Sequence, residues 1–95
     1  MAAMTLSQDE IKESLAGLDD WKIGDKENSK LFPTDDFTHS MDLATRIGEL
    51  ADEQEHHPDI LIQYDRVTVT LSTHSAGGVT EKDVELARGI EDLAT

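Results

Sequence analysis

Apolar side chains recur at helical spacing in three segments of the chain, which lie near its beginning, its middle and its end. The first segment follows residues 7–10, whose Ser-Gln-Asp-Glu pattern is typical of a capping box at a helix start. We expect this first helix to end near Gly17. The apolar stripes of the three predicted helices are Ile11, Leu15 and Leu18, then Leu43, Ile47 and Leu50, and finally Val84, Ala87, Ile90 and Leu93.

The second and third predicted helices also have recognisable ends. The second is expected to start between residues 35 and 40 and to run to about Glu55. Pro58 sets that end, because the residue before a proline is pushed out of the helical region of backbone conformation. Thr80 and Asp83 are predicted to cap the third helix.

Two stretches before the middle helix predict a first pair of strands. Residues 21–23 begin a short strand, and residues 30–32 form its hairpin partner. The segment between them, 24–29, is rich in turn formers. Pro33 cannot donate a ladder hydrogen bond, so we expect the second strand either to be an edge strand or to end there.

Two alternating stretches after the middle helix predict a second hairpin. They are residues 60–64, which end at Tyr64, and residues 67–71, with the turn at Asp65-Arg66 between them. The predicted order is helix–strand–strand–helix–strand–strand–helix (αββαββα). This order indicates an α+β fold, in which a four-stranded antiparallel sheet carries the helices on one face. We expect residues 1–95 to form one domain.

The composition narrows the possible classes of protein. The 95 residues include no cysteine, which excludes disulfides, iron–sulfur clusters and thiol catalysis. A chain of this length buries one modest core, so we expect a shallow site or one that a second subunit completes. No stretch resembles a secretory signal or reaches membrane-spanning length, so we expect a cytoplasmic protein without a membrane partner.

Acidic side chains outnumber basic side chains by a wide margin. Asp and Glu number 21 against 8 Lys and Arg, which gives a formal net charge of −13. Such a surface repels phosphate backbones and acidic lipids, so nucleic-acid binding is disfavoured. In about 1 M salt the Debye length is only about 3 Å, which screens the repulsion among surface carboxylates. We therefore expect a halophilic source and a protein that loosens in low salt.

Three of the four histidines, His56, His57 and His74, lie within nineteen residues of one another. Histidine exchanges protons near neutral pH without special tuning. His56 and His57 follow the middle helix and His74 follows the last strand, so their rings can converge where these ends meet. One ring held protonated and another held neutral would supply an acid and a base in one cleft.

Other interpretations fit these residues less well. A zinc or iron site would use the histidines and nearby carboxylates, but the chain has no His-x-x-x-His or His-Glu-x-x-His motif. Nucleophilic catalysis would use one of the hydroxyl side chains that flank His74, yet no Gly-x-Ser-x-Gly elbow is present. Tyr64 and Asp83 also have simpler possible roles, in strand packing and in helix capping.

The histidines are part of a longer pattern. Its members are Asp52, His56-His57-Pro58, Tyr64, His74 and Asp83. This pattern, together with the stretch 56–87 around it, resembles the pterin-4a-carbinolamine dehydratase family. The resemblance extends more weakly over the rest of the chain. One departure is Asp52, which stands where many relatives have Glu.

The resemblance implies a reaction and a set of site residues. The reaction is dehydration of 4a-hydroxytetrahydropterin to quinonoid dihydropterin and water by histidine acid/base catalysis, with no metal or organic cofactor. His56 and His74 are expected to transfer the protons, and His57 to bind and orient the substrate. The other residues that the resemblance implies in pterin binding are Asp52, Glu55, Pro58, Ser72, Thr73 and Ser75.

Family members generally form dimers or tetramers through sheet edges and helices, so we expect a homodimer or homotetramer. Two other classes of function stay open. The first is a non-catalytic pterin-binding or protein-binding module of the same fold, which would bind without turnover. The second is a small metalloprotein, which elemental analysis of the purified chain would reveal.

Overall fold

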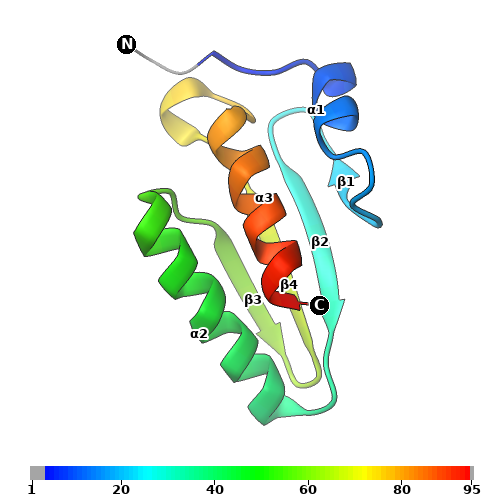
Figure 1. The fold of residues 1–95 in the computed structure, drawn as a ribbon, viewed down its shortest axis with the longest axis vertical. Helices are drawn as coiled ribbons and strands as arrows, with labels where there is room; N and C mark the ends of the chain where they lie inside the picture. Colours follow the sequence, from blue (N-terminus) through cyan, green and yellow to red (C-terminus); the bar gives the residue numbers. More distant parts are fainter. Residues whose placement is uncertain (1–3, 95) are drawn as a thin grey trace.

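Three helices and a four-stranded antiparallel sheet form two layers in the computed structural model, which describes residues 4–94 (Figure 1). The elements are α1 (Gln8–Ser14), β1 (Lys22–Ile23), β2 (Asn28–Pro33), α2 (Phe37–Gln54), β3 (Asp59–Gln63), β4 (Arg66–Leu71), the short 3-10 helix η1 (His74–Ala76) and α3 (Glu81–Ala94). The predicted α+β class and αββαββα order are confirmed. Within residues 4–94, no helix has the length and apolar character that crossing a membrane requires.

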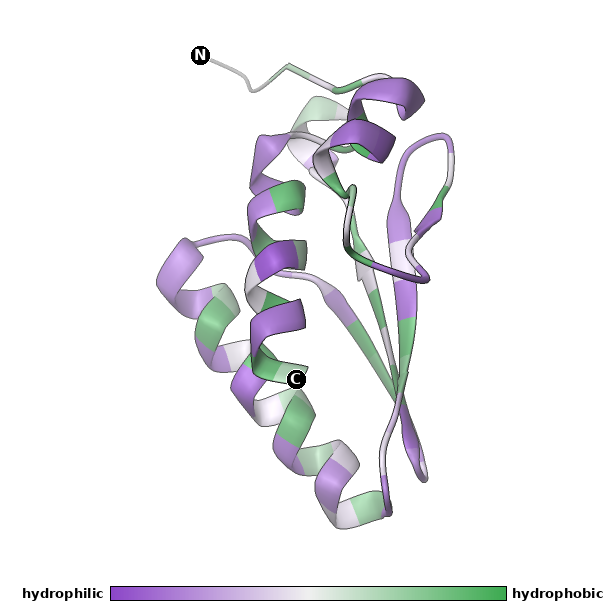
Figure 2. Ribbon diagram, turned by 45° about the vertical axis from the view of Figure 1, so that its right-hand side comes forward, coloured by the Kyte–Doolittle hydropathy of each residue, from purple (hydrophilic) through white to green (hydrophobic). Residues whose placement is uncertain are grey.

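The strands are ordered β1-β2-β4-β3, and each neighbouring pair runs antiparallel. The two faces of β4 differ, because successive side chains of a strand point to opposite sides. Val67, Val69 and Leu71 are fully buried against the helices, whereas Thr68 and Thr70 point the other way. We call this second side the open face of the sheet, because the helix layer lies on the opposite side (Figure 2).

Apolar side chains between the two layers form the core. In Figure 2 the hydrophobic positions of the helices are interleaved with hydrophilic ones, as expected for amphipathic helices. Gly89 lets α3 approach α2 closely, because a Cβ atom there would lie 2.7 Å from Cδ2 of Leu50. The buried core consists of Ile11, Leu15, Phe32, Ile47, Val67, Val69, Leu71, Val79, Val84, Leu86, Ala87 and Ile90.

Helix α1 begins as predicted and ends slightly earlier. The Ser7 N–H donates to Oε1 of Glu10 at 2.9 Å, and the Glu10 N–H donates to Oγ of Ser7 at 3.2 Å, which completes a capping box. The last helical residue is Ser14. Gly17 lies in the turn that follows, with a φ of 90° that favours glycine.

The C-terminal end of helix α2 is formed differently from the prediction. We expected Pro58 to end it, but Glu55 already leaves the helix in the left-handed conformation, with φ 53° and ψ 38°. The Glu55 N–H donates to the carbonyl of Asp52 at 3.2 Å. The His56 N–H donates to the carbonyl of Ala51 at 3.1 Å. These two bonds form a Schellman motif, whose left-handed position usually holds glycine.

The turn between β3 and β4 lies one residue earlier than predicted. Gln63 pairs with Arg66, so the two turn residues are Tyr64 and Asp65. Tyr64 has a φ of 45° and is 68% exposed. The prediction that Tyr64 continues the strand was therefore wrong. It lies at the opposite end of this hairpin from the histidines, because β3 begins after residue 58 and β4 ends at residue 71.

Strand β2 is longer and more central than predicted. It pairs with β1 on one side and with β4 on the other. Pro33 is its last residue, so of the two expected positions the strand end is correct. On its core face, Lys30 forms an ion pair with Glu91 of α3. Glu91 also accepts a hydrogen bond from Nε1 of Trp21 at 2.9 Å, which ties the start of the sheet to the last helix.

Candidate active site

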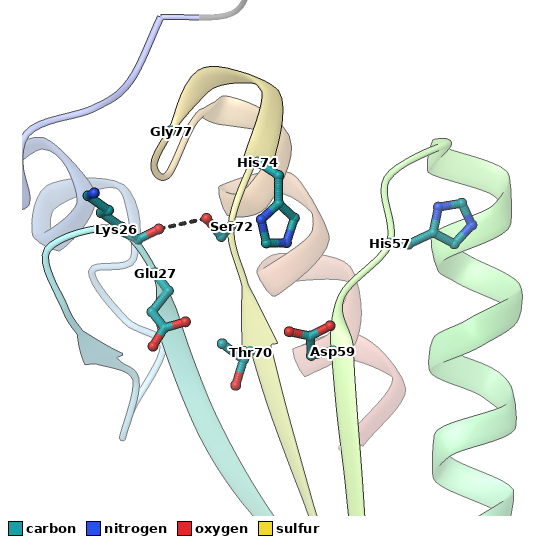
Figure 3. A pocket seen from close by; sticks show the side chains of 8 residues that line it. All are labelled: Lys26, Glu27, His57, Asp59, Thr70, Ser72, His74 and Gly77. Atoms are coloured by element: carbon teal, nitrogen blue, oxygen red, sulfur yellow. Dashed lines mark hydrogen bonds between the residues drawn. The ribbon is translucent and has the colours of Figure 1, made fainter.

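A hollow of about 240 Å³ lies on the open face at one end of the sheet, beside the β1–β2 turn, the start of β3 and the end of β4 (Figure 3). Two of the three predicted histidines, His57 and His74, line it. The other lining residues are Lys26, Glu27, Asp59, Thr70, Ser72 and Gly77. Residues from distant parts of the sequence therefore meet around one opening.

The loop after β4 holds His74 at this opening. Thr73 and Gly78 form a β-bridge, in which the Thr73 N–H donates to the Gly78 carbonyl at 2.8 Å. His74 begins η1 inside this closed loop, and Gly77 ends η1 with a φ of 76°, a conformation that favours glycine. In Figure 3 the His74 ring points from the loop toward the strands. Because this side chain is exposed, its imidazole can meet a ligand directly.

His57 borders the hollow from the link between α2 and β3. Its ring turns toward α2 in Figure 3. Nε2 of His57 lies 2.8 Å from Oδ1 of Asp52, and the two side chains are 64% and 78% exposed. Asp52 was predicted as a pterin-binding residue. In the structure it does not line the hollow and contacts His57 instead.

His56 lies inside the protein, unlike its chain neighbour. Its Nε2 is 2.5 Å from Oδ1 of Asp83, and the two side chains are 11% and 0% exposed. The hollow is lined by two of the three predicted rings and not by His56. The reason is that His56 pairs with a carboxylate on α3, whereas His57 pairs with one on α2.

Asp83 is both a helix cap and the partner of His56. The Thr80 N–H at the start of α3 donates to Oδ2 of Asp83 at 2.9 Å, so the predicted capping role is confirmed. The Thr73 hydroxyl donates to the same oxygen at 2.8 Å. Together with the imidazole, these donors satisfy a fully buried carboxylate, which offsets the cost of removing it from water.

The remaining predicted pterin-binding residues occupy different environments. Ser72 lines the hollow, and its hydroxyl donates to the backbone carbonyl of Lys26 at 2.7 Å. This bond attaches the β1–β2 turn to the end of β4. Thr73 is buried and bonded to Asp83. Three further predicted residues do not line the hollow, namely Glu55, Pro58 and Ser75.

Two acidic side chains of the hollow, Glu27 and Asp59, were not among the predicted site residues. Their carboxylates flank Thr70 in Figure 3. Asp59 pairs with Thr70 across β3 and β4, so strand alternation could have placed both on the open face beside Ser72. Glu27 gave no such signal, because its segment was interpreted only as a turn. The two carboxylates favour a ligand that carries or develops positive charge.

The three imidazoles therefore have three different environments. His74 is exposed at the hollow, His57 is exposed and paired, and His56 is partly buried and paired. Different environments allow groups of one kind to serve as acid and as base in the same reaction. Within the described part of the chain, no three His, Asp or Glu side chains are grouped so that they could hold a metal ion.

Comparisons with known proteins connect this site to a family. The profile of the family described as pterin 4 alpha carbinolamine dehydratase matches residues 4–93. The chain belongs to this family. A Sulfolobus acidocaldarius member is 42% identical over 90 residues, which cover 95% of this chain and 99% of that protein. A Nocardia farcinica member is 43% identical over 94 residues, which cover 99% of each. Both are named "putative pterin-4-alpha-carbinolamine dehydratase".

Solved structures related to the pterin dehydratases share the fold. A Brucella melitensis crystal structure, described as a transcriptional coactivator/pterin dehydratase, superposes with a TM-score of 0.88 at 34% identity, over 96% of this chain and 99% of that one. A pterin dehydratase-like protein, described as a RuBisCO assembly factor in the α-carboxysome, superposes with a TM-score of 0.68 over 81% of this chain and 92% of that one. Its 21% identity limits that likeness to the fold.

Proposed function

We propose that this chain is an active dehydratase that converts 4a-hydroxytetrahydropterin to quinonoid dihydropterin and water. The observation that supports this most is that His57 and His74 share one hollow while the adjacent His56 is paired with a buried carboxylate. Family membership supplies the substrate class. The arrangement of imidazoles supports the type of chemistry.

The reaction needs two proton movements and no redox partner. The C4a–O bond breaks, and the hydroxyl oxygen takes a proton and leaves as water. N5 loses its proton to a base, and the electron pair of that N–H bond forms the C4a=N5 double bond. Positive charge develops at C4a and N5 as the oxygen departs, and a nearby carboxylate stabilises such charge.

Each named residue has one role in this proposal. His74 transfers one proton at the hollow, and His57 binds and orients the pterin. His56 does not line the hollow, and in this proposal it transfers the other proton through the ring nitrogen that is not bonded to Asp83. Glu27 and Asp59 supply the negative charge that stabilises the developing cation, because both line the same hollow. Ser72 contributes its position at the end of β4, where it contacts the β1–β2 turn.

Stopped-flow measurement of 4a-hydroxytetrahydropterin decay tests the proposal. We expect the wild-type protein to accelerate decay, and His56→Gln and His74→Gln each to lose at least about tenfold, the low end for one acid/base group. His39→Gln is the matched control, because His39 is an exposed histidine that does not line this hollow. Unchanged rates in both site variants, or no acceleration by the wild-type protein, would contradict the proposal.

A non-catalytic module is the second candidate. It is favoured by one observation, the fold shared with a protein described as a RuBisCO assembly factor. This candidate predicts that a dihydropterin or a protein partner binds and that the wild-type chain gives no turnover. Equilibrium binding of a stable dihydropterin, measured on the same preparation as the kinetics, separates the two candidates.

The assembly state is part of the same proposal. We expect a homodimer or homotetramer, because large apolar side chains remain exposed on the monomer. Leu31 and Leu61 lie on the open face of the sheet, and Phe37 and Met41 lie on α2. Light scattering during size-exclusion chromatography would contradict this expectation if it gave the mass of one chain, 10.5 kDa, at all concentrations.

A further inference from the structure

A buried chain of hydrogen bonds reaches His56 through Asp83. Its members are Thr73 in the loop after β4, Thr80 at the start of α3, and Asp83 in the first turn of that helix. They are 5%, 1% and 0% exposed. Water therefore has little access to these bonds, and their directions are set by the protein itself.

The number of protons that each side chain carries determines which partner donates in each of these hydrogen bonds. An ionised carboxylate can only accept, so the Thr73 hydroxyl donates its single proton to Oδ2 of Asp83, at 2.8 Å. Thr73 can then only accept from the Thr80 hydroxyl, which lies 2.8 Å away. The Thr80 oxygen in turn accepts from the N–H of Lys82 at 3.3 Å. The chain of donors thus runs from Thr80 through Thr73 to Asp83.

These bonds also fix which carboxylate oxygen faces His56. Oδ2 of Asp83 is occupied by two donors, the Thr73 hydroxyl and the Thr80 N–H. Oδ1 is left for Nε2 of His56. Because the carboxylate only accepts, Nε2 must carry a proton whether the ring is neutral or charged. Nδ1 is then the nitrogen of this ring that is left to face a substrate or water.

We propose that Thr73 and Thr80 are positioning residues that hold Asp83 so that His56 keeps its Nε2–H tautomer and exchanges protons through Nδ1. The role in catalysis rests on the proposed dehydratase function. The tautomer does not, because it follows from the hydrogen bonds that an ionised Asp83 accepts. The inference therefore specifies a structural result and a kinetic result that can be measured separately.

The neighbouring pair of His57 and Asp52 provides a matched control. His57 and Asp52 have the same contact, Nε2 to Oδ1, but both side chains are exposed. Among residues 4–94, no chain of buried hydroxyl groups fixes the Asp52 carboxylate, and water can replace either partner. An Asp→Asn change should therefore affect the two histidines differently.

The structural test is NMR of protein labelled with ¹⁵N-histidine, at about pH 8.5, roughly two units above the ordinary histidine pKa of about 6.5. We expect the Nε2–H tautomer for His56 in the wild-type protein. In Asp83→Asn, the amide oxygen must take the place of Oδ2 to accept from Thr73 and Thr80. The amide NH₂ then faces Nε2, so the neutral His56 ring should switch to the Nδ1–H tautomer.

Asp52→Asn is the control for this measurement and should cause no such switch at His57. An Nδ1–H tautomer of His56 in the wild-type protein would overturn the inference, and the wild-type spectrum alone can decide this. Retention of Nε2–H in a folded Asp83→Asn variant would overturn it as well.

The kinetic test compares two substitutions at Thr73, one that removes the hydroxyl group and one that keeps it. Thr73→Val removes the hydroxyl and should lower kcat by about tenfold with little change in KM, while Thr73→Ser should restore most of the rate. Equal kcat values for the two variants would overturn the positioning role. If the wild-type protein shows no turnover but the predicted tautomers are found, the dehydratase proposal fails and the positioning of His56 stands.

Discussion

At the scale of single residues, the partner of each histidine decides what its ring can do. His57 and His39 pair with exposed aspartates near them in sequence, whereas His56 pairs with a buried aspartate from another helix. His74 is exposed at the hollow. Residues of one type thus have separate environments, which the surrounding elements determine.

His39, which lies outside the site, offers a test of how an aspartate partner changes a histidine. Its hydrogen bond to Asp36, at 2.7 Å, raises the pKa of His39 above 6.5. The backbone N–H of His39, followed by its ring, lowers the pKa of Asp36 below 3.8. The histidine contribution to stability is complete below pH 6.5 and is lost as pH rises through the raised pKa. The aspartate contribution is present above pH 3.8 and is lost as pH falls through the lowered pKa.

We therefore expect His39→Gln to lower the melting temperature slightly between pH 3.8 and 6.5, with a smaller difference at higher pH. The effect should be small because the pair is exposed. Thermal melts of both proteins across this range at one salt concentration provide the measurement. A difference that is constant or grows with rising pH would contradict the assignment.

Only part of the hollow's lining could be predicted at this scale, and the burial of the individual side chains could not. The spacing of the histidines predicted that their rings meet at the ends of neighbouring elements, and His57 and His74 do line one hollow. Ser72, which was expected from the family resemblance, lines the same hollow. The inward position of His56 could not be predicted, because it depends on a carboxylate 27 positions away. Glu27 was also missed, since it reaches the hollow from a different hairpin.

At the scale of elements, the periodicity of apolar residues predicted the order of helices and strands correctly. The residue types at turns and helix ends did not predict correctly how those turns and ends form. Tyr64 and Glu55 adopt left-handed conformations, at φ 45° and 53°, although neither residue type favours them. Patterns based on glycine, asparagine and proline therefore misplaced the second hairpin turn and misattributed the end of α2. At both positions a residue with a Cβ atom adopts the left-handed conformation.

Replacing Glu55 tests whether the left-handed conformation of this residue costs stability. Glu55→Gly should raise the free energy of unfolding by roughly 1 kcal/mol, because glycine adopts the left-handed conformation without the Cβ clash. Chemical denaturation gives this value, and Glu55→Ala, which keeps a Cβ atom, is the matched control. A Glu55→Gly variant no more stable than Glu55→Ala would contradict the account of this helix end. An increase in KM in both variants would show that the Glu55 side chain also binds substrate.

At the scale of the whole molecule, a formal charge of −13 is spread over 95 residues. Few cations are available to balance it, and Lys30 is already paired with Glu91 between the two layers. Repulsion among surface carboxylates opposes the compact state in dilute buffer. The fold tolerates this charge because its core is apolar and the acidic side chains lie mostly on the surface.

Salt should therefore stabilise this protein. Between about 0.1 M and about 3 M KCl we expect the melting temperature to rise, since the Debye length falls from about 10 Å to below about 3 Å. Each 1 kcal/mol recovered by screening should add about 4–8 °C for a domain of this size. Thermal melts in KCl, with an uncharged osmolyte as control, provide the measurement. An unchanged melting temperature would contradict the predicted adaptation to salt.

The measurement that tests the central claim most directly is a titration of ¹⁵N-histidine-labelled protein with a stable dihydropterin, followed by NMR. The four histidines report on separate places in one spectrum, and His39 lies outside the proposed site. If the hollow is the pterin site, the ring signals of His57 and His74 shift on binding and those of His39 do not. Shifts at His39 with none at His57 or His74 would contradict the account.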